Sequence, residues 1–75
     1  MVYPNPFPFT NHLEITGDEV IKRIQIFNIV GITVFDQENI DQQTTGIEIK
    51  NIPAGTYILS LTILQGTQVK KIVKN

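Results

Sequence analysis

The sequence predicts an all-β fold, a small antiparallel β-sandwich of six or seven short strands with immunoglobulin-like, Greek-key connections. Isoleucine, valine and threonine are abundant while alanine occurs once, which favours strands over helices. Apolar and polar residues alternate over short segments, as they do in half-buried strands. Turn signals with glycine or proline recur at a spacing of about 8–12 residues, which is typical of small β-sandwiches.

The opening stretch YPNPFPF, residues 3–9, predicts an edge strand. Prolines occupy alternate positions of this stretch: Pro4, Pro6 and Pro8. Because proline lacks the N–H group, one edge of the strand cannot build a ladder and the other edge can. Phe7 and Phe9 then share one face and are expected to enter the core. A polyproline linker that packs on nothing is the alternative.

The next segments predict strands, with one ambiguity. Leu13 and Ile15 alternate with polar residues before the turn-like pair at 17–18. Residues 18–31 fit a helix that Asp18 caps and Gly31 ends. However, seven of residues 20–30 are Val, Ile or Phe, and the polar positions around Ile24 and Ile26 alternate. A strand is therefore favoured over the helix.

Residues 28–31 predict a short loop with glycine at a position of positive φ. Ile32 and Val34 resume the alternation on a return strand. The polar stretch DQENIDQQTTG, residues 36–46, is expected to form the longest surface loop. Ile47 and Ile49 then alternate with charged residues in another strand.

The last third of the chain predicts two strands. Residues 52–55 fit a type I turn with proline second and glycine fourth. The apolar run TYILSLTIL, residues 56–64, is expected to be central or covered on both faces. One face of this run is entirely apolar: Tyr57, Leu59, Leu61 and Ile63. Gln65-Gly66 predicts a hairpin turn, and residues 67–74 the final strand, with a bulge or burial on both faces.

Composition restricts the function. Seventy-five residues predict one domain spanning 1–75, with a core that buries only about 60 % of the unfolded surface. The chain has no cysteine, hence no disulfide and no thiolate metal site. Six basic against seven acidic residues give no electrostatic case for nucleic acid. We expect neither a transmembrane segment nor an N-terminal signal peptide.

A catalytic site is not expected. His12 is the only histidine and Ser60 the only serine, and a Ser-His-Asp triad needs both in one pocket. Ser60 lies among leucines in mid-strand, where a small hydroxyl fills space. His12 follows Asn11 in a turn-like stretch, which predicts an exposed turn histidine.

Metal and cofactor sites are not expected either. Asp36, Glu38 and Asp41 are spaced loosely like a calcium loop, but without its density of acids and glycine, so a solvated acidic loop is favoured. No glycine-rich phosphate loop is present. The aromatic residues fall at strand spacing and are interpreted as core rather than a stacking platform: Phe7, Phe9, Phe27, Phe35 and Tyr57.

Basic residues gather at the end of the chain. Three of the six occur among the last six residues: Lys70, Lys71 and Lys74. They fit a charged edge strand that resists aggregation. They fit equally well a recognition tag that a receptor reads in extended form.

Several motifs resemble one family. YPNP at 3–6, NIPAGTY at 51–57 and KKIVK at 70–74 occur in this order along the chain, with IFNIVG at 26–31 between the first two. Each motif is weakly specific, but together they cover the whole chain. The sequence resembles the type A C-terminal sorting domain of the type IX secretion system, the Por secretion system of Bacteroidetes-like bacteria.

The resemblance implies a C-terminal module of a larger secreted protein, of which this chain is a fragment. Met1 is then interpreted as a start residue added to that fragment. The cargo would cross the inner membrane by its own signal peptide. Shuttle proteins and the outer-membrane translocon would then recognise the domain. A cysteine-peptidase sortase would remove it at the cell surface by cutting upstream of this fragment. The domain is then a substrate and not an enzyme, and no cofactor is implied.

The motif match assigns roles to particular residues. Pro4, Asn5 and Pro6 would form the opening strand, and Gly55 and Tyr57 would carry the central motif. The C-terminal signal would comprise Lys70, Lys71, Ile72, Val73 and Lys74. The proline at position 8 departs from the commonest pattern of the family.

Two other functions compete with this one. Residues 52–57 also resemble the turn before a tyrosine-bearing strand in fibronectin type III adhesion modules. Those domains normally carry a buried tryptophan, and this chain has none. A carbohydrate-binding sandwich would need exposed aromatics or a calcium cluster. In any of these cases an exposed edge strand can lead to self-association.

Overall fold

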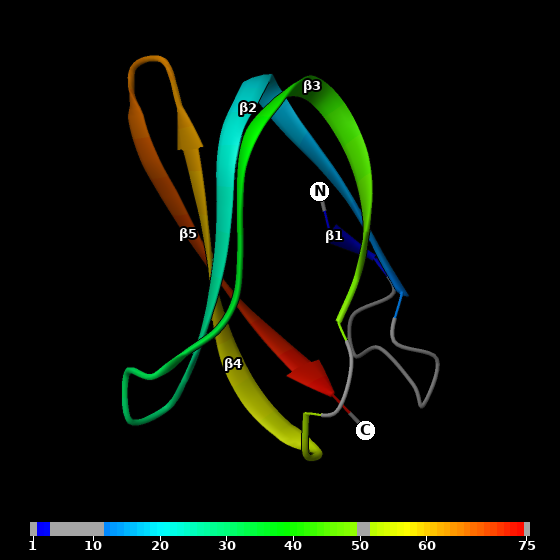
Figure 1. Cartoon of the computed structure of the whole chain (residues 1–75), viewed down its shortest axis with the longest axis vertical. Coiled ribbons are helices and arrows are strands. Elements are labelled where there is room, and N and C mark those ends of the chain that lie inside the picture. The colour runs from blue at the N-terminus through cyan, green and yellow to red at the C-terminus, as the bar shows by residue number, and fades with distance from the viewer. Residues whose placement is uncertain (1, 4–11, 50–51, 75) are drawn as a thin grey trace.

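A computed structural model describes residues 2–3, 12–49 and 52–74. These residues form five strands of a single antiparallel sheet (Figure 1). The strands are β1 (Val2–Tyr3), β2 (His12–Asn28), β3 (Thr33–Glu48), β4 (Gly55–Ile63) and β5 (Gly66–Lys74). The all-β, antiparallel prediction is confirmed, and residues 18–28 are strand rather than helix.

Strand β2 organises the sheet, because every other strand except β5 pairs with it. Its first half pairs with β1, where Ile15 faces Val2, and its second half pairs with β4 on the same edge. Along its other edge β2 pairs with β3 from Glu48 back to Thr33. Strand β5 pairs with β4 in an unbroken register from Gly55–Lys74 to Ile63–Gly66.

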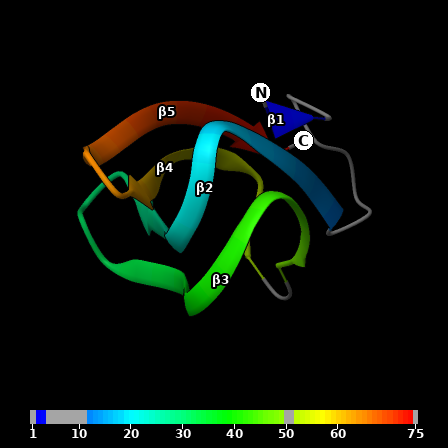
Figure 2. The same ribbon diagram turned by 90° about the horizontal axis from the view of Figure 1, so that it is seen from above.

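Irregularities in β2 and β3 let the sheet curl around its own core. The β2–β3 register shifts between Thr16 and Ile21 and again between Ile21 and Arg23. On the opposite strand, Asn39 and Asp41 have φ angles of 57° and 52°, which break a regular extended backbone. Both long strands therefore bend sharply, as Figure 2 shows from above.

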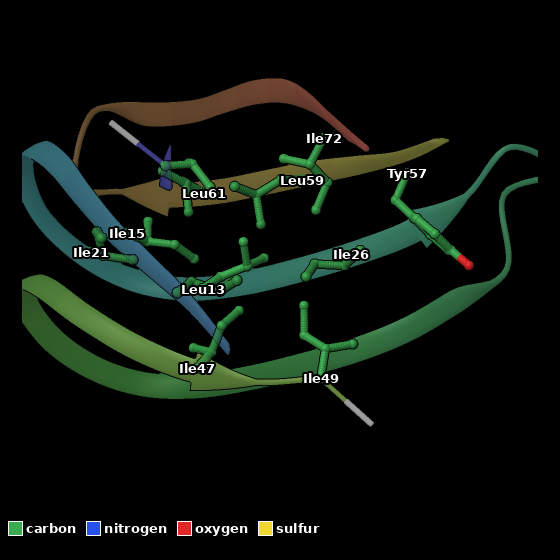
Figure 3. Packing of buried hydrophobic residues seen from close by; sticks show 12 residues of the cluster. Leu13, Ile15, Ile21, Ile26, Ile47, Ile49, Tyr57, Leu59, Leu61 and Ile72 are labelled. Atoms are coloured by element: carbon green, nitrogen blue, oxygen red, sulfur yellow. The ribbon is translucent and has the colours of Figure 1, made fainter. Parts of the chain in front are cut away.

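The core lies inside this curl. Side chains from the two halves of β2 and from β3, β4 and β5 point toward one another (Figure 3). The buried apolar residues are Val2, Leu13, Ile15, Ile21, Ile24, Ile26, Ile47, Ile49, Tyr57, Leu59, Leu61, Ile63 and Ile72. The predicted apolar face of residues 57–63 is therefore confirmed.

The bulge around Lys22 explains why residues 18–31 also fit a helix. Before the bulge the buried residues of β2 have odd numbers, as Ile15 and Ile21 do. After the bulge they have even numbers, as Ile24 and Ile26 do. A switch of parity within an alternating pattern produces apolar spacings of three, which are also helical spacings.

Two details of the sequence prediction are wrong, and one is not confirmed. A sandwich of six or seven strands is not confirmed, because the described residues form five strands of one sheet, in which segments expected to be separate strands join into two long, bent ones, β2 and β3. Residues 36–46 are strand rather than loop, since they pair with β2 despite their polar composition. Strand β5 shows no register shift against β4, and Val69 on it is exposed, so the expected bulge or double burial is absent there.

Three other expectations meet different outcomes. The β4–β5 turn is one residue earlier than predicted, at positions 64–65. The φ angle of 90° at Gly31 confirms the glycine loop after β2. The predicted edge strand with Pro4, Pro6, Pro8, Phe7 and Phe9 lies outside the described residues and stays a prediction.

Candidate recognition surface

Three of the four motifs that carry the family resemblance come together at one end of the sheet, those at 26–31, 51–57 and 70–74. In the strand register Asn28 pairs with Tyr57, and Tyr57 pairs with Ile72. The next row joins Phe27, Ile58 and Lys71 in the same way. Residues 26–32, 52–58 and 70–74 therefore form what we call the motif end, in the lower part of Figure 1. Segments more than a dozen residues apart in sequence are neighbours there.

The β2–β3 hairpin supplies one part of the motif end. The side-chain oxygen of Asn28 accepts hydrogen bonds from the backbone N–H groups of Val30, at 3.1 Å, and Ile32, at 2.9 Å. The backbone of Asn28 also pairs with Ile32 and Gly31. An asparagine side chain that mimics backbone acceptors stabilises such a turn locally.

The start of β4 supplies the second part. Gly55 is exposed there with a φ angle of 151°. Tyr57 is only 4 % exposed, and its hydroxyl donates a hydrogen bond to the carbonyl oxygen of Pro53. Tyr57 thus anchors the segment before β4 from within the core, and Gly55 lies on the surface; this segment has a bend at Ala54 but no turn is assigned to residues 52–55, so the predicted type I turn is not confirmed.

The end of β5 supplies the third part, and its five predicted signal residues do not form one patch. Lys70 and Lys71 are exposed and pair with Leu59 and Ile58, so their side chains start from opposite faces of the sheet. Ile72 is fully buried, and Val73 is half-buried.

Lys74 is only 8 % exposed, although a lysine at a chain end is expected to be solvated. Of the predicted signal residues at this end, Lys70 and Lys71 therefore offer charge at the surface, while Ile72 and Lys74 lie within the structure. The other predicted site residues, Pro4, Asn5 and Pro6, lie outside the described residues.

His12 lies on β2 rather than in a turn, and it joins two carboxylates. Its Nε2 and Nδ1 atoms are each 2.6 Å from a carboxylate oxygen, of Glu14 and Glu48 respectively. These hydrogen bonds raise the pKa of His12, with Glu14 the larger contributor. Ser60 lies instead on β4 between Gln25 and Val69, so the pairing does not bring a serine to this histidine.

The acidic residues of β3 pair with cations of β2. Arg23 donates to both carboxylate oxygens of Asp36, at 2.9 Å and 2.6 Å, and is 3.5 Å from Glu38. Lys22 is 2.8 Å from Asp41. The hydrogen bond from Arg23 lowers the pKa of Asp36. Within the described residues no group of three or more metal-ligating side chains converges.

A cavity of about 400 Å³ lies near the bend of β2, with Val2, Asp18 and Lys70 among its lining residues. Its lining includes one acidic and one basic residue, but neither His12 nor Ser60. In the part of the chain that the structure describes, no helix is long and apolar enough to cross a membrane.

Sequence reasoning missed two features of these sites. The hydrogen bond between His12 and Glu48 depends on the β2–β3 register, and composition does not reveal that register. The hydrogen bonds by which Asn28 stabilises the hairpin turn were predictable in part. An asparagine before a glycine turn is a sequence signal for such bonds, but the sequence does not show which N–H groups its side-chain oxygen accepts from.

Comparison with known proteins identifies the family. The model of the secretion system C-terminal sorting domain matches residues 1–75, which is the whole chain and includes every segment of the motif end. A search of curated proteins found no match to this chain. The fibronectin-like adhesion alternative is not supported. A sorting domain is a non-catalytic secretion signal that interacts with the secretion system. The chain therefore belongs to the type IX secretion C-terminal sorting domains, signals for export across the outer membrane to the cell surface or the extracellular space.

Proposed function

We propose that the type IX translocon recognises this domain at the motif end, as a folded surface and not as an extended tail. The observation that carries the proposal is the register in which Asn28, Tyr57 and Ile72 form one row across three strands. This row brings three of the four family motifs side by side although the chain separates them.

The domain acts as the C-terminal module, residues 1–75, of a larger secreted cargo. Shuttle proteins and the outer-membrane translocon are its partners. A cysteine-peptidase sortase then removes it at the cell surface by cutting upstream of these residues, so the domain is a substrate and performs no chemistry.

The partly buried end of β5 supports recognition of a folded surface. A receptor that read residues 70–74 as a free extended tag would need Ile72 and Lys74 to leave their buried positions. Removing a fully buried isoleucine from the core costs about 2–5 kcal/mol, judged from large-to-small core substitutions. Lys70 and Lys71 are accessible without that cost.

The test is export of a reporter fused to residues 1–75 in a bacterium with the type IX system. Lys70→Glu with Lys71→Glu reverses two surface charges at the motif end without touching the core. Lys22→Glu is the matched control, an exposed lysine on β2 that pairs with Asp41. We expect export to fall for the double variant and to persist for the control.

A second arm deletes the last five residues, which removes Ile72 and Lys74 and thereby also weakens the fold. Export that survives both this deletion and the charge reversal would contradict the proposal. Loss of export after the deletion alone would show that the fold is needed and that these two charges are not read.

A further inference from the structure

The tip of the β2–β3 hairpin presents three large apolar side chains to solvent. Ile29, Val30 and Ile32 are 78 %, 74 % and 61 % exposed. Resting on the function proposed above, we propose that this apolar tip (residues 29–32) is a plug that inserts into an apolar pocket of a protein of the secretion machinery.

The exposure of the apolar tip calls for an explanation. Single exposed apolar residues are normal on protein surfaces, whereas a cluster marks an interaction site. The other exposed apolar residues are apart from one another: Val20 lies on β2, Leu64 in the β4–β5 turn and Val69 on β5. Only at the apolar tip do three exposed apolar residues fall within four positions, among the residues described.

The apolar tip is held in a defined shape before any partner arrives. The side-chain oxygen of Asn28 holds the loop in shape, because it accepts hydrogen bonds from the N–H groups of Val30 and Ile32. The φ angle of 90° at Gly31 allows the tight return, and no atom lies within 4 Å of the space a Cβ would fill. A preformed loop loses little conformational freedom when it binds, which favours affinity.

The size and charge of this region favour a pocket in a larger protein over a second copy of this chain. A stable protein interface uses about 20–30 residues a side, and the apolar tip offers three large side chains. Buried apolar anchors in a pocket of the partner carry much of the binding energy of interfaces. Residues 29–32 carry no charge, while Lys70 and Lys71 are exposed at the same end of the sheet, one on each of its faces, which fits a larger partner with acidic residues on both sides of an apolar pocket.

The experiment compares export of the reporter fusion in three variants. The polar variant carries Ile29→Ser, Val30→Ser and Ile32→Ser. The conservative variant carries Ile29→Val, Val30→Ile and Ile32→Val. The control variant carries Leu64→Ser and Val69→Ser, which remove equally exposed apolar groups outside the motif end. Thermal unfolding of the purified 75-residue chain is measured for each variant.

We expect export of the polar variant to fall about tenfold or more, as for loss of an interface anchor. The conservative and control variants should be exported like the unchanged fusion. Equal export of the polar variant overturns the inference. Failure of the unchanged fusion to be exported would instead refute the function proposed above, so the two failures are distinguishable.

A crosslinking arm decides the matter even if the polar variant unfolds. A photoreactive apolar residue replaces Val30 in one fusion and Leu64 in another, and crosslinking is done in cells during export. We expect adducts with a protein component of the type IX machinery from position 30 and not from position 64. Adducts with lipid alone, with a second copy of the domain, or at equal yield from position 64 would overturn the inference.

Discussion

The hydroxyl of Tyr57 donates a hydrogen bond to the carbonyl oxygen of Pro53, four residues earlier in the chain. This contact ties the segment before β4 to a residue that lies in the core. One buried side chain thus stabilises the core and fixes the position of residues 52–55 at the motif end. A tyrosine hydroxyl that bonds to the backbone a few residues upstream serves the same purpose in immunoglobulin-like domains.

Tyr57→Phe tests this contact because it keeps the ring and removes the hydroxyl. We expect a loss of about 1 kcal/mol in the free energy of unfolding, the usual value of one hydrogen bond. Tyr57→Ala should cost about 3–5 kcal/mol because it also empties the core. Urea denaturation measures both. Equal stability of Tyr57→Phe and the unchanged chain would show that the segment before β4 does not depend on this bond.

Gly17 is buried where β2 begins to bend, and a larger residue has no room there. An added Cβ would lie 2.9 Å from the backbone oxygen of Glu19 and 3.1 Å from Ile21 Cγ1. We expect Gly17→Ala to lower the free energy of unfolding by about 1–3 kcal/mol, as overpacking does. Asp18→Ala is the neighbouring control on an exposed residue, expected within about 0.5 kcal/mol of the unchanged chain. Chemical denaturation of both variants shows whether the close approach at the bend matters.

The stability of the domain should depend on pH through His12. Its pKa is raised above the ordinary value of 6.5 by hydrogen bonds to Glu14 and Glu48. A group whose pKa is raised by folding stabilises the protein below its unfolded pKa and ceases to do so as pH rises through the folded pKa. We therefore expect stability to decline as pH rises above 6.5, because the protonated His12 ring that the two hydrogen bonds favour is then lost.

The measurement is urea denaturation over a pH series, with His12→Gln as the comparison. The decline should be absent in this variant. Titration of the His12 ring by NMR should give a midpoint above 6.5. A midpoint at or below that value would contradict the arrangement of His12 between two carboxylates.

Gly46 provides the space in which the His12 ring lies. A Cβ at this position would be 2.9 Å from His12 Cε1 and 3.1 Å from Glu14 Oε1. We expect Gly46→Ala to displace the ring and to bring the NMR midpoint of His12 back toward its ordinary value. In a double-mutant cycle on stability, the effect of Gly46→Ala should shrink in a His12→Ala background. Additive effects would indicate that the glycine matters for another reason.

The sequence predicted those parts of the fold that local pattern determines. Alternation at Tyr57, Leu59 and Leu61 correctly gave the buried face of β4, and Gly31 correctly marked the turn after β2. Residues 36–46 were predicted as loop because their composition is polar. Their strand conformation depends on pairing with β2 and on contacts such as Arg23 with Asp36, which are tertiary effects.

The candidate site was predictable only in part. The motifs were visible in the sequence, but their arrangement in one row follows from the strand register. Burial of Lys74 could not be predicted, because a charged residue at a chain end is expected to be exposed. The apolar tip at 29–32 is apolar in sequence as well, yet only the structure shows that its side chains point away from the core.

Hydrogen–deuterium exchange of the 75-residue chain, with and without purified type IX translocon, tests recognition at the motif end most directly. We predict slower exchange on binding in residues 26–32, 52–58 and 70–74 together, with the β4–β5 turn at 64–65 unchanged. Protection confined to the 64–65 turn, or to residues 70–74 alone, would contradict recognition of a folded surface.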